Sequence, residues 1–325
     1  MAKLDLTTPV RPLLRPGRAG PSRPRRSARR LVRGLWSFKA LCLLPAVAYV
    51  ILLFGYPAVF SIQLGFYSDN AAQFITHTGV FVGFANYTQL FHDATFISAL
   101  LHTLIFAVVT VVAQFLFGLL IASLLNKQGL VYAGIRTLLL VPWLLPLIVS
   151  GNIWIWMLDN FYGVINYFLV TLHLTSHYVA WLSSPNLSLW AVIGANTWLG
   201  IPFNVMIIYA GLRAIPVDLY EAARVDGAGP LTRLTRITLP QLRDVTGVLV
   251  LLGIIYSIKL FDVVWVMTKG GPANASQVLG TLEYQDTFEL NQYGYGAAIA
   301  NVMLVLSMIG GIVYVRFTRR GIRNG

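Results

Sequence analysis

The sequence predicts an all-α integral membrane protein with six transmembrane helices, and three observations lead to this fold class. Of the 325 residues, 57% are hydrophobic and only 11% are charged, whereas about a quarter of the residues in a soluble domain carry charge. Six apolar runs are each long enough to cross a hydrocarbon core that needs about 20 helical residues. The segments that join these runs alternate between rich and poor in positive charge, as expected if successive segments lie on opposite sides of a bilayer.

The elements follow in chain order. Residues 1–37 are rich in proline and arginine and show no apolar period, so they are predicted to form a disordered basic tail before a membrane domain over 38–325. The first apolar run is too long for a signal peptide and is not followed by a small-residue cleavage site, so it is expected to remain as a helix. A short apolar stretch within 159–187 is expected at the outer membrane surface. The six spans are predicted at residues 40–63, 97–125, 137–158, 188–211, 245–267 and 296–316.

The positive charges fix the orientation of these spans. Of the 24 lysines and arginines, 11 fall within the first 39 residues. Segments 64–96 and 159–187 contain neither residue type, and 268–295 contains only Lys269. In the six-span arrangement, 22 of the 24 positive residues therefore lie on one side. Because positive loops stay on the cytoplasmic side, both termini are predicted to lie in the cytoplasm.

Charge and composition also narrow the possible partners and chemistry. A net charge of +12 could indicate nucleic-acid binding, but the charges lie in the tail and in short loops between spans. Anionic lipid headgroups are therefore the nearer partner, and no nucleic-acid partner is expected. The single cysteine, Cys42, excludes an intramolecular disulfide and a cysteine metal cluster. The sequence has neither a phosphate-binding Gly-x-x-x-x-Gly-Lys-Ser/Thr loop nor a His-Glu-x-x-His motif, so we predict no catalytic residue, no metal site and no enzymatic activity in this chain.

The cytoplasmic segment 213–243, between the fourth and fifth spans, has the pattern of two short helices. Helical spacing continues as far as Gly227, which can adopt a positive φ and turn the chain. A second helix can begin at Pro230, and Pro240 ends or kinks it before the next span. The pattern predicts a helix–turn–helix elbow across the cytoplasmic ends of the spans. Glu221 would present there a carboxylate that can accept charge-assisted hydrogen bonds from a partner.

This elbow carries a resemblance to a known family. Glu221-Ala222-Ala223, then Gly227, then Ile237-x-Leu239-Pro240 resembles the EAA loop of bacterial ABC importer permeases, with every position at the family's spacing. Other segments resemble the maltose-permease-like subunits of the sugar-importer branch of this family. The resemblance covers roughly residues 40–320, and its further segments are Gly83–Phe91, Asn196–Pro202, Met267–Pro272 and Ala297–Ala300.

The resemblance implies a fold, partners and a function. The fold would be that of a type I ABC importer permease, and the elbow would be a coupling helix that docks on a cytoplasmic ATPase. The chain would work in a bacterial inner membrane with a second, homologous permease subunit as a heterodimer, two ATPase subunits and an extracytoplasmic binding protein. It would import a sugar or related polyol and bind no cofactor itself, since ATP and Mg would be held by the ATPase. The expected coupling residues are Glu221, Ala222, Ala223, Asp226, Gly227, Ile237, Leu239 and Pro240.

A substrate path is also expected, because sugars are held by amides, hydroxyls and aromatic rings in concave, mainly apolar sites. The stretch from Asn196 to Phe203 matches the part of maltose-permease-like subunits that contributes sugar contacts. Their asparagine-rich fifth-span segment is not reproduced here, so maltose itself is not implied, and a disaccharide, an amino sugar and a glycerol phosphate ester all remain open. The candidate path residues are Asn196, Trp198, Gly200, Phe203, Tyr256, Ser257, Lys259 and Asp262.

Two of these candidates are charged residues inside a predicted span, where charge is costly and often functional. Lys259 and Asp262 lie three residues apart, so they are expected to share one helix face. They would either line the path, or contact a second permease, or form a structural ion pair. They also support an alternative function, an ion-coupled secondary transporter with this pair as its coupling site. A third alternative, a membrane scaffold without transport activity, gives no reason for the elbow.

Overall fold

The computed structural model describes residues 42–68, 70–76 and 78–322. The predicted disordered tail, 1–37, lies outside the described residues. The chain divides into two compact units, residues 1–57 and 58–325. The described part of the first unit is helical from Cys42, includes the π-helix η1 (Ile51–Gly55), and contains no buried side chain. The helix continues as α2 (Tyr56–Leu64), most of which belongs to the second unit.

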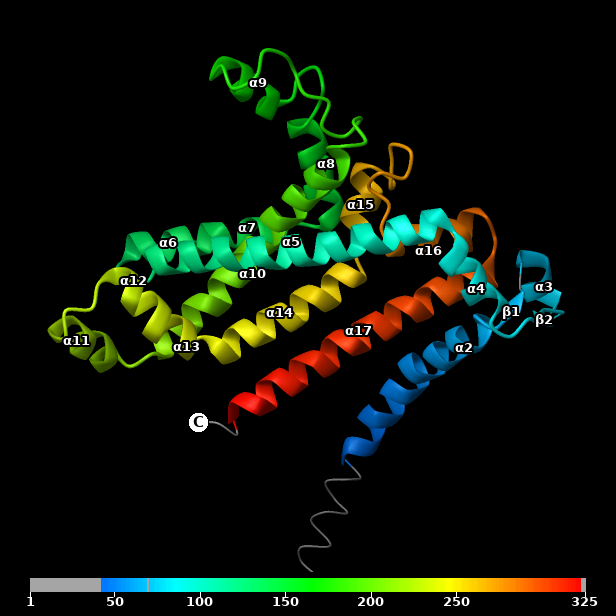
Figure 1. The fold of residues 1–325 in the computed structure, drawn as a ribbon, viewed down its shortest axis with the longest axis horizontal. Coiled ribbons are helices and arrows are strands. Elements are labelled where there is room, and N and C mark those ends of the chain that lie inside the picture. The colour runs from blue at the N-terminus through cyan, green and yellow to red at the C-terminus, as the bar shows by residue number, and fades with distance from the viewer. Residues whose placement is uncertain (1–41, 69, 77, 323–325) are drawn as a thin grey trace, which may run out of the picture. The chain divides into compact units, whose positions relative to one another are not determined.

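Four long helices form the body of the second unit. The first begins where the Asp93 carboxylate accepts a hydrogen bond from the Thr95 backbone amide at 2.8 Å, which satisfies one free donor at the helix start. This helix packs along the second, and the third lies between it and the fourth (Figure 1). The four are α5 (Ala94–Leu124), α10 (Ser188–Ala214), α14 (Arg243–Ile258) and α17 (Tyr293–Ile322).

Over the described residues, four helices are long and apolar enough to cross a membrane, and six if each of two bent helix pairs counts as one span. The prediction of an all-α membrane protein with six spans is thereby confirmed. The first bent pair joins α6 (Leu130–Leu139) and α7 (Val141–Leu144) to α8 (Leu147–Met157) at 96°. The bend falls at Pro146, whose missing amide and steric bulk force the preceding residue into an extended conformation. The third predicted span is therefore a broken helix and not a straight one.

The two ends of the second unit carry different short elements. At one end lies the elbow, built from α11 (Val217–Val225), α12 (Pro230–Arg233), η2 (Leu234–Thr238) and α13 (Leu239–Gln241), and it bends into α14 at 69°. This is the end that the charge pattern assigns to the cytoplasm, and α17 also ends there (Figure 1).

The outer elements lie away from the elbow end. The antiparallel pair β1–β2 has Tyr67 opposite Phe81. The elements are β1 (Tyr67–Ser68), α3 (Ala71–Thr76), β2 (Val80–Phe81), α4 (Ala85–His92), α9 (Val164–Thr171), α15 (Asp262–Met267), α16 (Leu279–Tyr284) and η3 (Gln285–Glu289).

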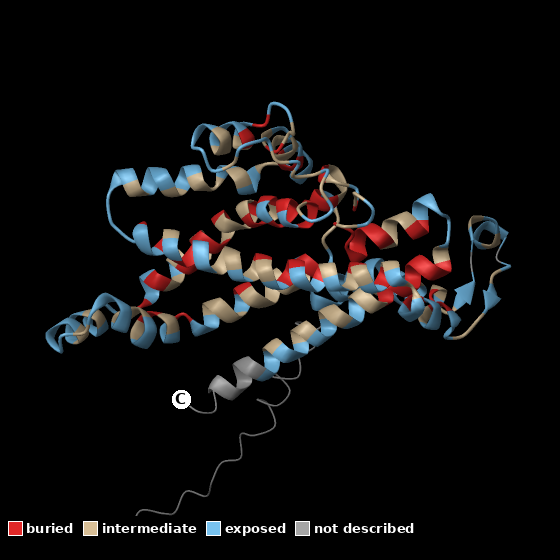
Figure 2. Ribbon diagram, turned by 45° about the horizontal axis from the view of Figure 1, so that its top comes forward, coloured by how far each residue is buried: buried red, intermediate tan, exposed pale blue. Residues whose placement is uncertain are grey.

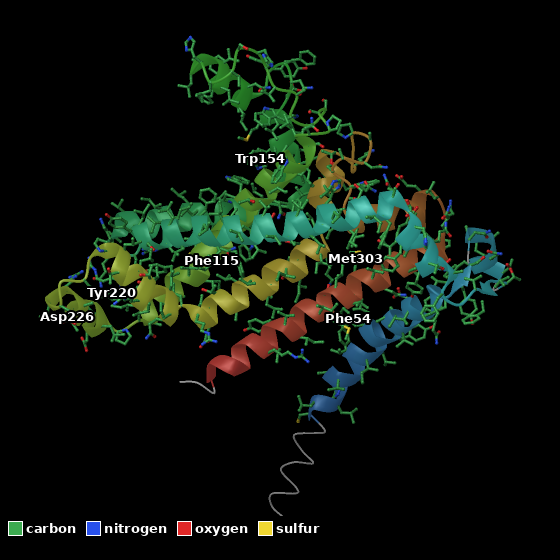
Figure 3. The ribbon with its side chains drawn as sticks, viewed as in Figure 1. Phe54, Phe115, Trp154, Tyr220, Asp226 and Met303 are labelled. Atoms are coloured by element: carbon green, nitrogen blue, oxygen red, sulfur yellow. The ribbon has the colours of Figure 1, made fainter. Side chains whose placement is uncertain are left out.

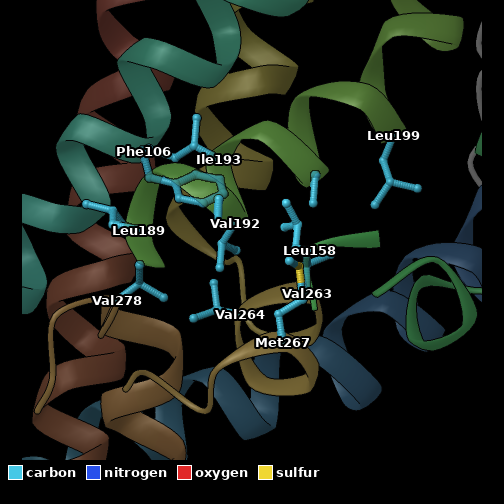
Figure 4. Packing of buried hydrophobic residues seen from close by; sticks show 12 residues of the cluster. Phe106, Leu158, Leu189, Val192, Ile193, Leu199, Val263, Val264, Met267 and Val278 are labelled. Carbon is cyan, nitrogen blue, oxygen red and sulfur yellow. The ribbon is translucent and has the colours of Figure 1, made fainter. Parts of the chain in front are cut away.

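Buried side chains concentrate between α5 and α10 and around α15 and α16, whereas the elbow is mostly exposed (Figure 2). One apolar cluster includes Phe106 of α5, Val192 of α10 and Val263 of α15 (Figure 4). Small residues allow this close packing, as is common between membrane helices. A Cβ on Gly118 of α5 would lie only 2.8 Å from the Cβ of Asn204 on α10. The close contact of α5 with α10 fixes the wall of the site described next.

Candidate functional site

A cavity of about 420 Å³ lies between α5, α7, the start of α8, α10 and the second half of α14. This volume is within the range of roughly 300–1,000 Å³ that small-molecule sites occupy. Seven of the eight residues predicted for the substrate path line it, and Trp198 does not. The residues with polar or aromatic side chains in its wall, together with Gly200, are Thr110, Gln114, Phe115, Trp143, Asn196, Gly200, Phe203, Asn204, Tyr256, Ser257, Lys259 and Asp262.

One wall of the cavity is a network of amides between α5 and α10. The Gln114 Nε2 donates a hydrogen bond to the Asn196 carbonyl at 3.0 Å, and the Gln114 Oε1 accepts one from the Asn204 Nδ2 at 3.4 Å. The same Asn204 Nδ2 donates to the Gly200 carbonyl at 3.0 Å. A Cβ on residue 200 would overlap the Gln114 carboxamide. Glycine is therefore what lets the Gln114 side chain lie against the α10 backbone.

A second wall is aromatic. The rings of Trp143 on α7 and Phe203 on α10 stack with centroids 5.9 Å apart and planes at 26°. Trp143 is about half exposed, and Tyr256 at the end of α14 is 70% exposed. Phe115, labelled in Figure 3, also lies in this wall, on α5. These flat apolar faces beside amide donors and acceptors suit a ligand that has both polar edges and an apolar face, as sugar rings do.

Trp198 has a different environment from the other predicted path residues. It packs against the apolar cluster of Leu199 and Val263, and its ring meets that of Trp154 edge to face, with centroids 5.9 Å apart. Trp154 lies on α8, away from the elbow (Figure 3). The structure therefore places Trp198 in the helix packing of the bundle and not in the cavity wall.

The prediction that Lys259 and Asp262 share one helix face is wrong. α14 ends at Ile258, the backbone is non-helical at Lys259 (φ −90°, ψ 8°) and at Phe261 (φ −130°, ψ −58°), and α15 begins at Asp262. Tertiary packing accounts for the break. A Cβ on Gly280 of α16 would lie 2.5 Å from the Leu260 carbonyl oxygen, so α16 packs directly on the interrupted segment.

Both charged side chains at this break are exposed and line the cavity. Within the described part of the chain, no ion pair joins the Lys259 ammonium to the Asp262 carboxylate. A discontinuous helix with polar groups at the break is a common way to build a transport site.

The elbow has the turn that its sequence predicts. Gly227 adopts φ +74°. Its amide donates to the Arg224 carbonyl at 3.1 Å, and the Ala228 amide donates to the Ala223 carbonyl at 2.8 Å, which closes the end of α11. Asp226, beside the turn, is exposed at the far end of the elbow (Figure 3). α12 then begins at Pro230, as predicted.

The eight predicted coupling residues divide into two groups. Ala223, Ile237 and Leu239 are half-buried, and the last two pack against the apolar cluster at the end of α10. The exposed group is available to a partner and consists of Glu221, Ala222, Asp226, Gly227 and Pro240. The hydroxyls of Tyr220 and Thr238 lie 3.0 Å apart and join α11 to η2.

Sequence reasoning missed several residues of both sites. Gln114 and Asn204 could have been found, because each is an amide inside an apolar span and polar groups there are rare and often functional. Nothing in the sequence pairs Trp143 with Phe203 or Tyr220 with Thr238, since each contact joins residues on separate helices.

A cluster of carboxylates lies at the outer end and does not line the cavity. Asp286 of η3 is buried, and its Oδ2 has no hydrogen-bond partner among the described residues. Burial, followed by the nearby charges of Asp93 and Glu283, raises the pKa of Asp286 to about 6. Burial also raises the pKa of Glu283. The Tyr295 hydroxyl donates a hydrogen bond to the Asp93 Oδ2 at 2.9 Å.

Comparisons with known proteins agree with these features. The family described as "binding-protein-dependent transport system inner membrane component" matches residues 114–323. The sulfoquinovosyl glycerol transport system permease protein SmoG of Agrobacterium fabrum is 35% identical over 279 residues, which is 86% of this chain and 89% of that protein. The trehalose/maltose transport system permease protein MalF of Thermococcus litoralis is 33% identical, over 86% of this chain and 92% of that protein.

A third relative is the diacetylchitobiose uptake system permease protein DasB of Streptomyces coelicolor, 33% identical over 84% of each chain. Among solved structures, a chain of the bacterial alginate ABC transporter superposes with a TM-score of 0.74, covers 90% of this chain and 96% of its own, and is 22% identical. At that identity the likeness shows the fold, which is that of a type I ABC importer permease. The chain belongs to the family of binding-protein-dependent transport system inner membrane components, and it is a permease subunit of an ABC importer.

Proposed function

We propose that this permease carries a sugar or a related polyol that an extracytoplasmic binding protein delivers. The observation that supports this most is the cavity, which is lined both by an amide network and by a stacked aromatic pair. This chemistry suits polyhydroxylated rings, because amides bind hydroxyls and aromatic faces cover apolar ring faces. The named relatives transport a sulfoquinovosyl glycerol, trehalose or maltose, and diacetylchitobiose, which supports the same substrate class.

The proposed complex contains this chain, a second homologous permease subunit, two cytoplasmic ATPase subunits and the binding protein. It sits in a bacterial inner membrane with both termini of this chain in the cytoplasm. ATP and Mg are bound by the ATPase subunits, and this chain binds no cofactor and no nucleic acid. The basic loops face anionic lipid headgroups.

The elbow is the proposed docking site for the ATPase. Glu221 is exposed on α11 and offers a carboxylate to a basic side chain of the partner. Closure of the ATPase pair on ATP would move the elbow, and α10 and α14, which flank it, would carry that movement to the cavity.

Affinity purification of the chain in mild detergent tests this assembly. We expect an ATPase to be retained by the parent and lost from Glu221→Lys, with membrane insertion unchanged. Glu289→Lys is the matched control, because it reverses an exposed carboxylate at the other end of the bundle and should retain the ATPase. Retention by Glu221→Lys equal to the parent would argue against docking at the elbow.

Substrate class is tested separately, by a thermal-shift screen of saccharides, polyols and glycerol phosphate esters on the cognate binding protein. The ligand found there is then used for uptake by the parent and by Asp262→Asn. We expect Asp262→Asn to lose uptake while it retains the ATPase, because the Asp262 carboxylate lines the cavity and the whole of α14 separates it from the elbow. Unchanged uptake would remove Asp262 from the proposed path.

A further inference from the structure

The first half of the broken span, α6, is held to the bundle by few side chains. None of its ten residues, all within the described part of the chain, is buried. Leu130, Val131 and Leu138 are each at least 70% exposed. α6 nevertheless leads through Leu140 directly into α7, which carries Trp143 and so forms part of the cavity wall. The position of that wall therefore depends on what fixes α6.

Arg136 reaches from α6 to the rest of the bundle, as does Leu139, which packs against the apolar cluster at the end of α10. The Arg136 Nη1 donates to the carbonyl of Leu125, the residue that caps α5, at 2.7 Å and lies 3.4 Å from the carbonyl of Lys127 in the loop that follows. Its guanidinium carbon lies 4.5 Å from the ring centroid of Tyr209 on α10. A cation is favoured at a helix C-terminus and over an aromatic face. One half-buried side chain thus connects α5, α6 and α10.

The contact with α10 is made close to the elbow. Tyr209 lies in the last two turns of α10, which ends at Ala214 just before α11. Nearer the start of the same helix, Phe203 stacks on Trp143. The α6–α7 segment therefore contacts α10 beside the elbow through Arg136 and at the cavity through Trp143, and Leu139 adds an apolar contact with the cluster at the end of α10.

We infer that Arg136 is a positioning residue that makes α6–α7 move together with α10, so that displacement of the elbow moves the Trp143 wall of the cavity. The inference rests on the proposed function, since the displacement comes from the ATPase partner. It requires arginine, because a planar guanidinium can stack on Tyr209 while it donates to the end of α5, and a lysine ammonium cannot do both in this geometry.

Coupling between hydrolysis and uptake tests the role of Arg136. The assembled complex in proteoliposomes is assayed for ATP hydrolysis and for substrate uptake, per complex, in Arg136→Gln, Arg136→Lys, Tyr209→Leu and Tyr209→Phe. We expect the uptake-to-hydrolysis ratio to fall about ten-fold, the usual scale of coupling between sites, in the first three. Tyr209→Phe keeps the aromatic face and should keep the parental ratio.

Lys127→Gln is the matched control, because it removes a positive charge from the loop just before α6, where the Lys127 ammonium lies over the Tyr132 ring of α6 and not over α10. It should leave the ratio unchanged. A merely structural role of Arg136 would reduce the amount of assembled complex and leave the ratio per complex at the parental value. That result, or equal effects of Tyr209→Phe and Tyr209→Leu, would overturn the inference.

Distances between spin labels give a second readout. Cys42→Ser removes the single cysteine, and labels are placed on Leu138→Cys of α6 and Ala210→Cys of α10, both exposed. We expect one narrow distance distribution in the complex, unchanged by ATP, and a broad one after Arg136→Gln. Equal distributions in the two proteins would overturn the inference. If the complex transports nothing with ATP, the proposed function fails, and these distances still decide whether Arg136 holds α6 to α10.

Discussion

Replacing Gly200 with alanine should affect substrate uptake far more than the free energy of unfolding, and so it tests the role of the cavity. The new Cβ would overlap the Gln114 carboxamide, so that side chain must turn away. It then loses its hydrogen bond to the Asn196 carbonyl and the weaker one from the Asn204 Nδ2, together worth about 1–2 kcal/mol. Alanine in place of glycine inside a helix contributes about 1 kcal/mol in the opposite direction. The free energy of unfolding is therefore expected to change little.

Transport, by contrast, should be strongly impaired. The added methyl group and the displaced carboxamide both enter a cavity of about 420 Å³, and one extra carbon in a binding pocket typically changes discrimination by about 10–200-fold. We expect uptake by Gly200→Ala to fall at least about ten-fold, measured in proteoliposomes at equal amounts of assembled complex.

Gly194→Ala is the matched control for this prediction. Residue 194 lies on the same helix, and a Cβ there would meet nothing within 4 Å. The control should gain about 1 kcal/mol in unfolding free energy and keep parental uptake. Thermal unfolding of the two purified complexes measures that difference. Full uptake by Gly200→Ala would refute the assignment of this cavity as the substrate path.

Three further predictions concern the elbow and the outer end. Tyr220→Phe loses the hydroxyl contact with Thr238, worth about 1 kcal/mol, and should retain less ATPase in affinity purification, whereas Tyr132→Phe should retain the parental amount. Gly227→Val places a branched side chain at φ +74°, at a cost of about 1–2 kcal/mol. This variant should insert into the membrane but lose uptake. Gly227→Asn should retain most of the uptake, because asparagine tolerates a positive φ. The pKa of Asp286 is raised from 3.8 to about 6, so the folded state binds the proton more tightly than the unfolded state. The free energy of unfolding should then fall as the pH rises from 3.8 to about 6 and should stay low above that pH. Asp286→Asn should flatten this profile and raise the melting temperature at pH 7.5, and an unchanged profile would contradict the burial argument.

Local patterns in the sequence predicted those features that depend on local chemistry. The turn at Gly227 and the start of α12 at Pro230 follow from backbone preferences of single residues. The break after Ile258 was missed, because it depends on α16 packing against the interrupted segment through Gly280, more than 20 residues further along the chain. Apolar periodicity indicates which face of a segment is buried, but it does not indicate which helix packs against that face.

Only part of the cavity wall was predicted, because some of its residues are brought together by contacts between separate helices. Asn196, Gly200 and Phe203 lie at helical spacing on one segment and were found together. Gln114 comes from a helix some 80 residues earlier, and only the packing of α5 on α10 brings its carboxamide to that wall. Trp198 has the right chemistry for a sugar site, but its position on α10 turns it toward the apolar cluster. Residue type alone does not indicate which face of a buried helix a side chain occupies.

The most direct test of ATP-driven import is accumulation of the identified ligand in proteoliposomes that contain the assembled complex and its binding protein, with ionophores present to collapse all ion gradients. We predict accumulation that requires ATP on the side of the elbow, persists without any ion gradient and is lost in Glu221→Lys. Accumulation that ignores ATP and stops when the ion gradients are collapsed would contradict the account, and would instead support an ion-coupled transporter that uses Lys259 and Asp262.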